Sequence, residues 1–377
     1  MRRYASPYTP GAGAMPRYLA GREGMLEEAD KILEAVVMGY PQKSVIYYGL
    51  RGVGKTVLLN AVEEKAEELN VLYTHIEIAE KRSFIIQIAN ASKKIIHRMS
   101  VVESAKALGH KALGILQAFQ VTYNPEEQTF TAGLSEPSMY ISSGVLSDDL
   151  TEMFVAMGRM AAKAQKAICF FIDEIQYMKS NEMEALINAL HRANQLRLPI
   201  IVYGAGLPKI LKILGDVKSY SERLFQYIEV AELSEPAAVD AIVKPAVELG
   251  VKYEEEAVEE IKEWSKGYPF FIQELCNTIW EETEGEIIKK SDVEHVIPIF
   301  LDKLDKGFFK IRFDRCTKKE HDFLFAMIRC GNLPCTISNV AEVLEKKVSS
   351  VSPTRAQLIS KGIIIYAFDG QFRINSF

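Results

Sequence analysis

The sequence predicts an α/β protein in which a parallel sheet is followed by a helical domain and a small C-terminal domain. Short apolar runs alternate with helical periodicity over residues 20–235, which is typical of a parallel sheet covered on both faces. Beyond Pro236 the strand pattern stops, and it returns only near the C-terminus. A chain of 377 residues is also too long for one compact core, so we expect two or three domains.

The first domain is expected to span residues 1–235. Its first 20 residues are rich in Pro, Gly and Tyr and should form an extended arm. Residues 100–147 are less regular; we interpret them as an insertion and expect a hairpin within VTYNPEEQTFTAG. The expected strands are SVIYYG (44–49), VLYTHIEI (71–78), AICFFID (167–173), PIIVYG (199–204) and QYIEVAEL (226–233). The expected helices cover 21–39, 55–70, 84–99, 148–166, 180–196 (capped by Ser180 or Asn181) and 207–215.

Two further domains follow. Residues 236–304 show helical patterns only and predict a small helical domain. Residues 305–377 contain three helical segments, of which SPTRAQLISKG (352–362) is the third, and two strands around Asp369-Gly370. Because Asp-Gly between alternating strands is a strong hairpin pattern, we expect a winged helix here.

Charge is distributed unevenly along the chain. Residues 1–304 carry a net charge of -10, whereas residues 305–377 hold 12 Lys and Arg against 7 Asp and Glu, a net +5. A basic tail is compatible with an anionic partner and equally with an ordinary solvated surface.

Membrane and secreted classes are not expected. No apolar run approaches the ~20 residues needed to cross a bilayer, and the basic N-terminus MRRYASPYTPGAGAMP lacks an apolar core. Five cysteines without CxxC spacing favour free thiols over disulfides or zinc, with a local Cys330–Cys335 pair as the alternative. We expect a cytoplasmic protein.

GLRGVGKT (49–56) matches G-x-x-x-x-G-K-[ST] at every fixed position. Its glycines let backbone N–H groups point inward and, with the following helix N-terminus, form a phosphate site. The strand before it and the helix after it argue against a chance glycine-rich turn. Lys55 is expected on the β- and γ-phosphates and Thr56 on Mg²⁺. The expected nucleotide-binding residues of this P-loop are Gly49, Gly52, Val53, Gly54, Lys55, Thr56 and Val57.

AICFFIDEIQ provides the second half of the predicted site. Asp173 and Glu174 follow a buried strand, and ligands gather at the carboxyl ends of parallel strands. Asp173 is expected to hold the metal, and Glu174 to orient and polarise an attacking water. The alternative is a pair of surface acids that cap the next helix.

Positive charge for the γ-phosphate is expected from Arg223 in SERLF, acting in cis or in trans on a neighbouring copy. A structural arginine paired with Glu222 or packed on Tyr227 is the alternative. Gly204 and Gly206 in YGAGLP should let the backbone approach the γ-phosphate, where many ATPases place a polar sensor. No Asn or Thr stands in that stretch, so we expect slow turnover.

The chain as a whole resembles the prokaryotic ATPases described as origin-recognition-like AAA+ ATPases, near the archaeal-ATPase and STAND groups of P-loop NTPases. The segments that carry the resemblance include GLRGVGKTVLLN, FFIDEIQYM, GAGLPK, SYSERLF, GYPFFIQE and SPTRAQLISKGII. The resemblance implies an ATP-binding AAA+-type core, a helical lid and a C-terminal winged helix.

Individual residues follow from the same resemblance. Lys55 and Thr56 match the Walker A positions, and Asp173 and Glu174 the Walker B positions. Arg223 falls where related initiator ATPases place an arginine finger. Two further nucleotide contacts are implied, Pro269 in the Gly-Tyr-Pro element of the lid and Arg22 in the N-terminal box. The lid lacks the sensor arginine of initiator proteins.

Two functions therefore remain open. One is a slowly hydrolysing ATPase whose nucleotide state, ATP or ADP with Mg²⁺, controls the C-terminal module. The other is a DNA-binding or protein-interaction regulator in which ATP is mainly structural. On DNA, the third helix of a winged helix would enter the major groove, with Arg355, Lys361 and Arg373 as candidate contacts. A homo-oligomer or a protein partner stays open.

Overall fold

The structure is a computed structural model that describes residues 5–79, 83–123, 140–217, 221–331, 334–366 and 371–374. Its chain divides into two compact units. One consists of Arg22–Gly49 and Gly54–Val230, and the other of Met1–Gly21, Leu50–Val53 and Ala231–Phe377. The boundary therefore crosses GLRGVGKT twice, so that the tip of this loop belongs to a different unit from its two ends.

The first unit is built on a five-stranded sheet in the order β2-β3-β4-β1-β5, with every pair parallel. Its strands are β1 (Ser44–Tyr48), β2 (Leu72–Glu77), β3 (Ile168–Asp173), β4 (Ile200–Gly206) and β5 (Phe225–Glu229). All residues of β3 and β4 are buried, which explains their nearly continuous apolar sequences. The predicted α/β class and parallel sheet are confirmed.

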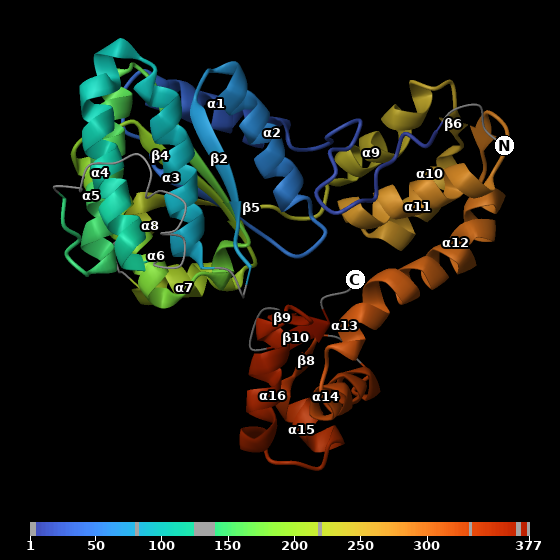
Figure 1. The fold of residues 1–377 in the computed structure, drawn as a ribbon. Helices are drawn as coiled ribbons and strands as arrows, with labels where there is room; N and C mark the ends of the chain where they lie inside the picture. Colours follow the sequence, from blue (N-terminus) through green and yellow to red (C-terminus); the bar gives the residue numbers. More distant parts are fainter. Residues whose placement is uncertain are drawn as a thin grey trace. The chain divides into compact units, whose positions relative to one another are not determined.

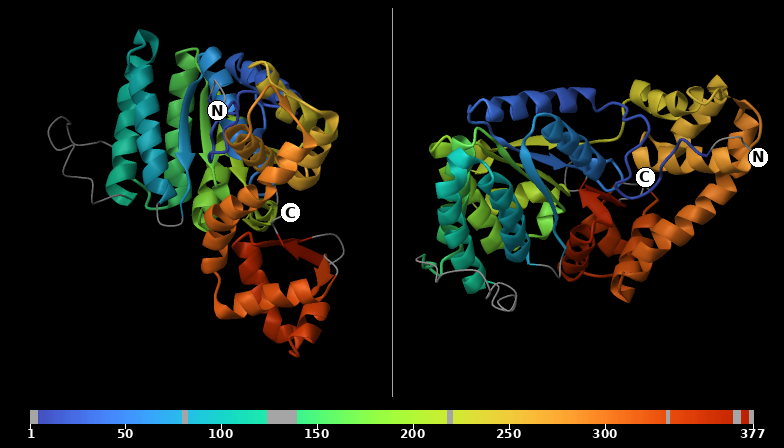
Figure 2. Two further views of the ribbon diagram at one scale, coloured as in Figure 1. Left: turned by 90° about the vertical axis from the view of Figure 1, so that its right-hand side faces the viewer. Right: turned by 45° about the horizontal axis from the view of Figure 1, so that its top comes forward.

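Helices cover both faces of this sheet, as Figures 1 and 2 show. They are α1 (Glu23–Val37), α2 (Lys55–Glu68), α3 (Phe84–Ser100), α4 (Lys106–Tyr123), α5 (Leu146–Lys163), α6 (Ser180–Gln195), α7 (Lys209–Val217) and α8 (Ser221–Leu224). Successive residues of β3 point to opposite faces: the Phe170 ring stacks on Phe154 of α5, whereas the Phe171 ring stacks on Tyr203 of β4. The Tyr203 hydroxyl in turn donates to the Ala29 carbonyl of α1.

Two details of this unit differ from the sequence-based expectation. Residues 106–123 form the regular helix α4, although we expected irregular structure there; the expected hairpin lies mostly in 124–139, outside the described residues. Helix α6 begins at Ser180 with Lys179 as its N-cap residue, and Glu182 accepts the Lys179 N–H at 3.0 Å. Ser180 is therefore the first helical residue and does not cap the helix.

The second unit begins with a helical segment formed by α9 (Glu235–Val247), α10 (Glu255–Ser265), α11 (Pro269–Glu282) and α12 (Lys290–Leu304). Two short parallel strands, β6 (Lys252–Tyr253) and β7 (Ile287–Ile288), also lie in it, so the expectation of helices alone was wrong. The described part of the N-terminal arm packs on this segment. Tyr8 is buried against Trp280, and its hydroxyl bonds the Ile242 carbonyl.

The C-terminal part of this unit has its own apolar core. After a π-helical turn at Asp305–Phe309 and α13 (Lys310–Asp314), its order is α14 (Lys318–Arg329), β8 (Cys335–Thr336), α15 (Ile337–Val343), α16 (Val348–Ser360), β9 (Ile364–Tyr366) and β10 (Gln371–Ile374). β10 lies between β8 and β9 and is antiparallel to both. The expected Asp369-Gly370 turn falls outside the described residues.

None of the described helices is long and apolar enough to cross a membrane. All five cysteines lie in the described part of the chain and are free thiols, so the alternative Cys330–Cys335 disulfide is not present.

An ion pair between the buried Glu320 and the exposed Lys361 joins both ends of the C-terminal core. Glu320, in the first turn of α14, is 1% exposed and accepts the Lys361 ammonium at 2.7 Å and the Thr317 N–H at 2.6 Å. Burial alone would raise the pKa of Glu320, but the hydrogen bonds from Lys361 and Thr317 outweigh it and lower that pKa. Lys361 also donates to the Arg315 carbonyl, so it ties α16 to the start of α14.

We expect Glu320→Gln to destabilise the C-terminal core at neutral pH by about 1–3 kcal/mol, because a buried charged hydrogen bond is lost. The lowered pKa means that the ion pair contributes stability above the ordinary glutamate pKa of ~4.3 and loses it as the pH falls below that value. Hydrogen exchange of α14 and α16 peptides, compared with the unsubstituted protein at each pH, should therefore show a difference that shrinks on acidification. An equal difference at pH 7 and at about pH 2.5 would contradict this account.

Candidate functional site

The loop that follows β1 ends in a strained glycine conformation from which α2 begins. The Gly49 N–H donates to the Gly206 carbonyl at 3.2 Å, which fixes the loop entrance to the end of β4. Gly52 and Gly54 have φ of 85° and 91°, values that side chains other than glycine rarely adopt. The first N–H groups of α2 have no intrahelical acceptor, so they and the helix dipole form an anion site.

A direct hydrogen bond joins this helix to the end of β3. Thr56 donates its hydroxyl to Asp173 Oδ2 at 2.6 Å, and the Glu174 N–H donates to Asp173 Oδ1 at 2.7 Å. Asp173 is only 5% exposed, so both of its oxygens are held in fixed positions. The residues predicted as the two metal ligands are therefore adjacent.

This oxygen pair fits Mg²⁺. Magnesium prefers hard oxygen ligands and usually combines one or two protein groups with waters and substrate phosphates. Within the described residues, no cluster of three or more His, Cys, Asp or Glu could hold a metal by itself. Thr56 and Asp173 would thus hold the ion jointly with phosphate oxygens.

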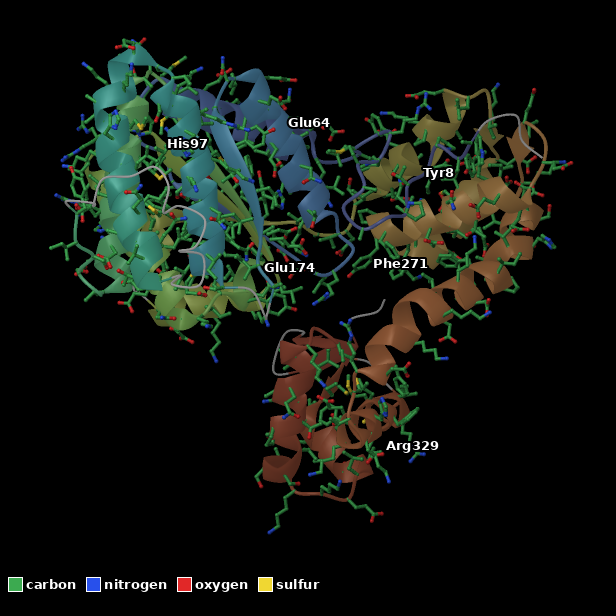
Figure 3. All side chains as sticks on the ribbon, in the orientation of Figure 1. Tyr8, Glu64, His97, Glu174, Phe271 and Arg329 are labelled. Carbon is green, nitrogen blue, oxygen red and sulfur yellow. The ribbon has the colours of Figure 1, made fainter. Side chains whose placement is uncertain are left out.

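Glu174 lies at the carboxyl end of β3 in the left-handed region, with φ of 52° (Figure 3). Its carboxylate accepts a hydrogen bond from the Gln176 carboxamide, and Gln176 Oε1 accepts the Leu207 N–H at 2.9 Å. We did not single out Gln176 from the sequence. The available indication was its place two residues after Glu174 in DEIQ.

The two glycines of YGAGLP make room for side chains. A Cβ on Gly206 would lie 2.5 Å from Gln176 Oε1, and one on Gly204 would lie 2.7 Å from Ile46 Cδ1. Their approach to a phosphate, which we expected, remains a prediction. In this structure the absence of side chains on the two glycines also makes room for Ile46 and Gln176 at the end of β4.

The tip of the loop is bonded to the helical segment of its own unit. Pro269 is the first residue of α11, and the Phe270 N–H that follows donates to the Gly52 carbonyl at 3.2 Å. Gly267 precedes them with φ of 75° and lies so close to Leu233 that a Cβ would come within 2.8 Å of its carbonyl oxygen. The Gly-Tyr-Pro element therefore positions the start of α11 next to the loop.

The two predicted arginines occupy different surroundings. Arg22 is 6% exposed and stands at the N-cap of α1. Arg223 is exposed in α8, immediately before β5, and Phe225 of β5 pairs with Ser44 at the start of β1. It therefore lies at the amino edge of the sheet. One five-residue strand, about 16 Å long, separates this edge from the phosphate loop, so the side chain cannot reach that loop in cis.

The three candidate DNA contacts also differ. Arg355 is half-buried on α16, and Arg373 stands on β10 opposite Ile365. Lys361 already bonds Glu320 and the Arg315 carbonyl, so we assign it a structural role. Exposed basic residues at the starts of α14 and α16 were not among our candidates; they are Lys318, Lys319, Lys346 and Lys347.

Comparison with known families identifies the loop-bearing segment. Residues 18–203 match the family model of the AAA ATPase domain, and residues 306–374 match a domain of unknown function (DUF8462). None of the curated protein sequences matches the chain. Residues 18–203 are therefore similar to AAA ATPase domains, which supports a nucleotide-binding P-loop ATPase.

Several solved structures are similar to this chain. A Walker-type ATPase of Pyrococcus abyssi has a TM-score of 0.56 at 15% identity, over 99% of this chain and 96% of that one. The Orc1 protein of Aeropyrum pernix, solved in complex with DNA, has a TM-score of 0.48 at 16% identity over 95% and 89% of the two chains. The RuvB Holliday junction branch migration motor of Thermotoga maritima has a TM-score of 0.46 at 17% identity over 93% and 91%. At 15% identity the likeness to the Pyrococcus abyssi ATPase concerns the fold alone.

We expect Thr56→Val to weaken Mg²⁺-dependent nucleotide binding about 10- to 150-fold, since one charge-assisted hydrogen bond is worth roughly 1.5–3 kcal/mol. Valine keeps the shape of threonine and removes only the hydroxyl. Titration of a fluorescent ATP analogue with Mg²⁺ and with EDTA should show the loss only in the presence of Mg²⁺. Equal weakening in EDTA would mean that Thr56 serves the loop's shape and has no role in holding the metal.

Proposed function

We propose that this protein is a slowly hydrolysing switch ATPase in which nucleotide state controls the C-terminal domain. The observation that carries the proposal is the bond between Thr56 and Asp173, because it places the end of the phosphate loop against the end of β3. Residues from separate segments thereby form one site at the carboxyl edge of a parallel sheet, where such sheets bind ligands.

Each residue of the site has a proposed task. The glycine loop and the N-terminus of α2 bind phosphate oxygens through backbone N–H groups, and Lys55 adds positive charge at the β- and γ-phosphates. Thr56 and Asp173 hold Mg²⁺, which supplies charge neutralisation on the transferred phosphoryl group. Glu174 orients the attacking water and accepts its proton.

Slow turnover follows from what the site lacks on its own subunit. The backbone at the end of β4 is glycine-rich and presents no Asn or Thr, and Arg223 lies at the opposite edge of the sheet. The charge that develops on the γ-phosphate thus meets Lys55 and the metal, and Arg223 of the same chain lies too far away to add to them.

The bond between Phe270 and Gly52 supports a switch. It links the first turn of α11 to the carbonyl of a loop residue whose amide neighbours bind phosphate. Nucleotide binding to the loop would therefore change the position of the start of α11 through this hydrogen bond. The nucleotide can shift the equilibrium only by its difference in affinity for the two states of the helical segment.

We expect Glu174→Gln to lower ATP turnover by about 10²–10⁴-fold, the usual contribution of a general base. Nucleotide affinity should stay within about threefold of the unsubstituted protein, because glutamine keeps the size of the side chain and the loop is untouched. Hydrolysis of radiolabelled ATP and titration of the fluorescent analogue measure the two quantities. Undiminished turnover would refute the proposed role of Glu174.

A second candidate function is DNA binding by the C-terminal domain. The order α14-β8-α15-α16-β9-β10 supports a winged helix in which α16 is the third helix. Four exposed lysines flank α14 and α16, within a segment of net charge +5. Third helices of this kind enter the major groove, and lysines near their ends contact phosphates.

If the domain binds duplex DNA, we expect affinity to fall steeply with salt, with a slope of log K against log[salt] of about -0.9 per phosphate contact. Lys347→Ala and Arg355→Ala should each reduce that slope by ~1. Lys212→Ala in α7 is the matched control, because Lys212 is equally exposed but lies on the other unit. Affinity that is absent, or flat with salt, would exclude this function.

A further inference from the structure

We propose that Gln176 is a positioning residue that orients the Glu174 carboxylate for water activation. The proposal rests on the function assigned above, in which Glu174 acts as the general base. It assigns a role to a buried side chain that neither the Walker motifs nor the phosphate loop accounts for.

Both ends of the Gln176 side chain are engaged. Its Nε2 donates to Glu174 Oε2, and its Oε1 accepts the Leu207 N–H at 2.9 Å. The side chain is 5% exposed, and Leu207 is 4% exposed. A buried backbone N–H requires an acceptor, so this bond fixes which way the carboxamide faces. With Oε1 committed to Leu207, only the N–H₂ end can face Glu174.

The backbone brings these groups together. Glu174 has φ of 52° and ψ of 35°, which turns the chain sharply after β3, and a single 3₁₀ turn over Ile175–Tyr177 returns Gln176 toward the sheet. Ile175 is fully buried beside Gly204, so the turn is packed in place. A non-glycine residue in the left-handed region costs free energy, and such strain persists where surrounding contacts hold it.

Gly206 completes the arrangement. Its φ is not among the positive values, so its backbone conformation is open to any residue. A Cβ there would nevertheless lie 2.5 Å from Gln176 Oε1 and 3.1 Å from Ile175 Cγ2. Glycine is needed at this position because of the Gln176 carboxamide.

The second carboxylate oxygen of Glu174, Oε1, indicates whether Gln176 raises or lowers ATP turnover. No described residue donates to Glu174 Oε1, whereas Oε2 is held by Gln176. A carboxylate fixed through one oxygen keeps the other available for water in a single orientation. Gln176 therefore raises turnover, since general-base catalysis requires hydrogen-bond geometry to the water. A residue that restrained Glu174 away from water would have the opposite effect.

The first test separates the two hydrogen bonds. Gln176→Glu keeps an acceptor for the Leu207 N–H but removes the donor to Glu174, whereas Gln176→Met removes both. We expect both variants to lose about 10- to 100-fold in kcat with little change in the Kd of the fluorescent ATP analogue. Both variants should also lower the melting temperature, Gln176→Met because the Leu207 N–H loses its acceptor and Gln176→Glu because two carboxylates then lie together. A kcat that is unchanged or raised in Gln176→Glu overturns the proposal.

A double-mutant cycle tests whether Gln176 acts through Glu174. In the Glu174→Gln background, Gln176→Met should cause no further loss in the residual turnover, because the carboxylate it positions is gone. If the fold-loss in turnover of the double variant equals the product of the two single fold-losses, Gln176 acts independently of Glu174 and the proposal is overturned. If the Glu174→Gln variant hydrolyses ATP at the normal rate, the proposed function itself fails. If Glu174→Gln is impaired but the Gln176 variants hydrolyse ATP normally, only the inference about Gln176 fails.

Gly206 provides an independent perturbation of the same contact. Gly206→Ala should reduce kcat by displacing the Gln176 carboxamide. In a chain that already carries Gln176→Ala, the same Gly206→Ala substitution should cause little further loss in kcat, because the side chain it would displace is gone. Gly215→Ala on α7 is the matched control, since a Cβ there meets no atom within 4 Å. A Gly206→Ala loss that persists in full without the Gln176 side chain would contradict the role given to the contact.

Discussion

The contact between the Thr56 hydroxyl and the Asp173 carboxylate is the interaction on which the site depends. Thr56 belongs to the helix after β1 and Asp173 ends β3, yet β1 and β3 are not neighbours, because β4 lies between them. The contact therefore forms only if all three strands are parallel and in register. If one of these strands were shifted by one residue relative to its neighbour, its side chains would turn to the opposite face of the sheet. Core packing and the chemistry of the site are thus fixed by the same register.

Much of the sheet unit was predictable from local pattern. The strands before the glycine loop and before Asp173 are buried on both faces, so their sequences are continuous apolar runs. Helix α4 was not predictable, because Gly109 and Gly114 lower helix propensity. These glycines serve packing: a Cβ on Gly114 would lie 2.5 Å from the Tyr140 ring, and one on Gly109 would lie 2.9 Å from Ser100 Oγ. Such reasons exist only in three dimensions.

The same distinction applies to the site. Lys55, Thr56, Asp173 and Glu174 belong to motifs whose spacing reflects a mechanism, so the sequence identified them. The role of Gln176 depends on a hydrogen bond from Leu207, 31 positions away, and the structural role of Lys361 depends on Glu320. Charge alone made Lys361 resemble a surface cation. Only tertiary contacts distinguish a lysine that binds a partner from one that closes its own domain.

The position of Arg223 has a consequence for symmetry. An arginine at the amino edge of the sheet and a phosphate loop at the carboxyl edge are two separate surfaces of one subunit. If that arginine serves a nucleotide, the nucleotide belongs to another copy. A head-to-tail contact between copies would bring these two surfaces together. Such an assembly closes into a ring or grows as a helix, and in an open assembly one terminal subunit always keeps an incomplete site.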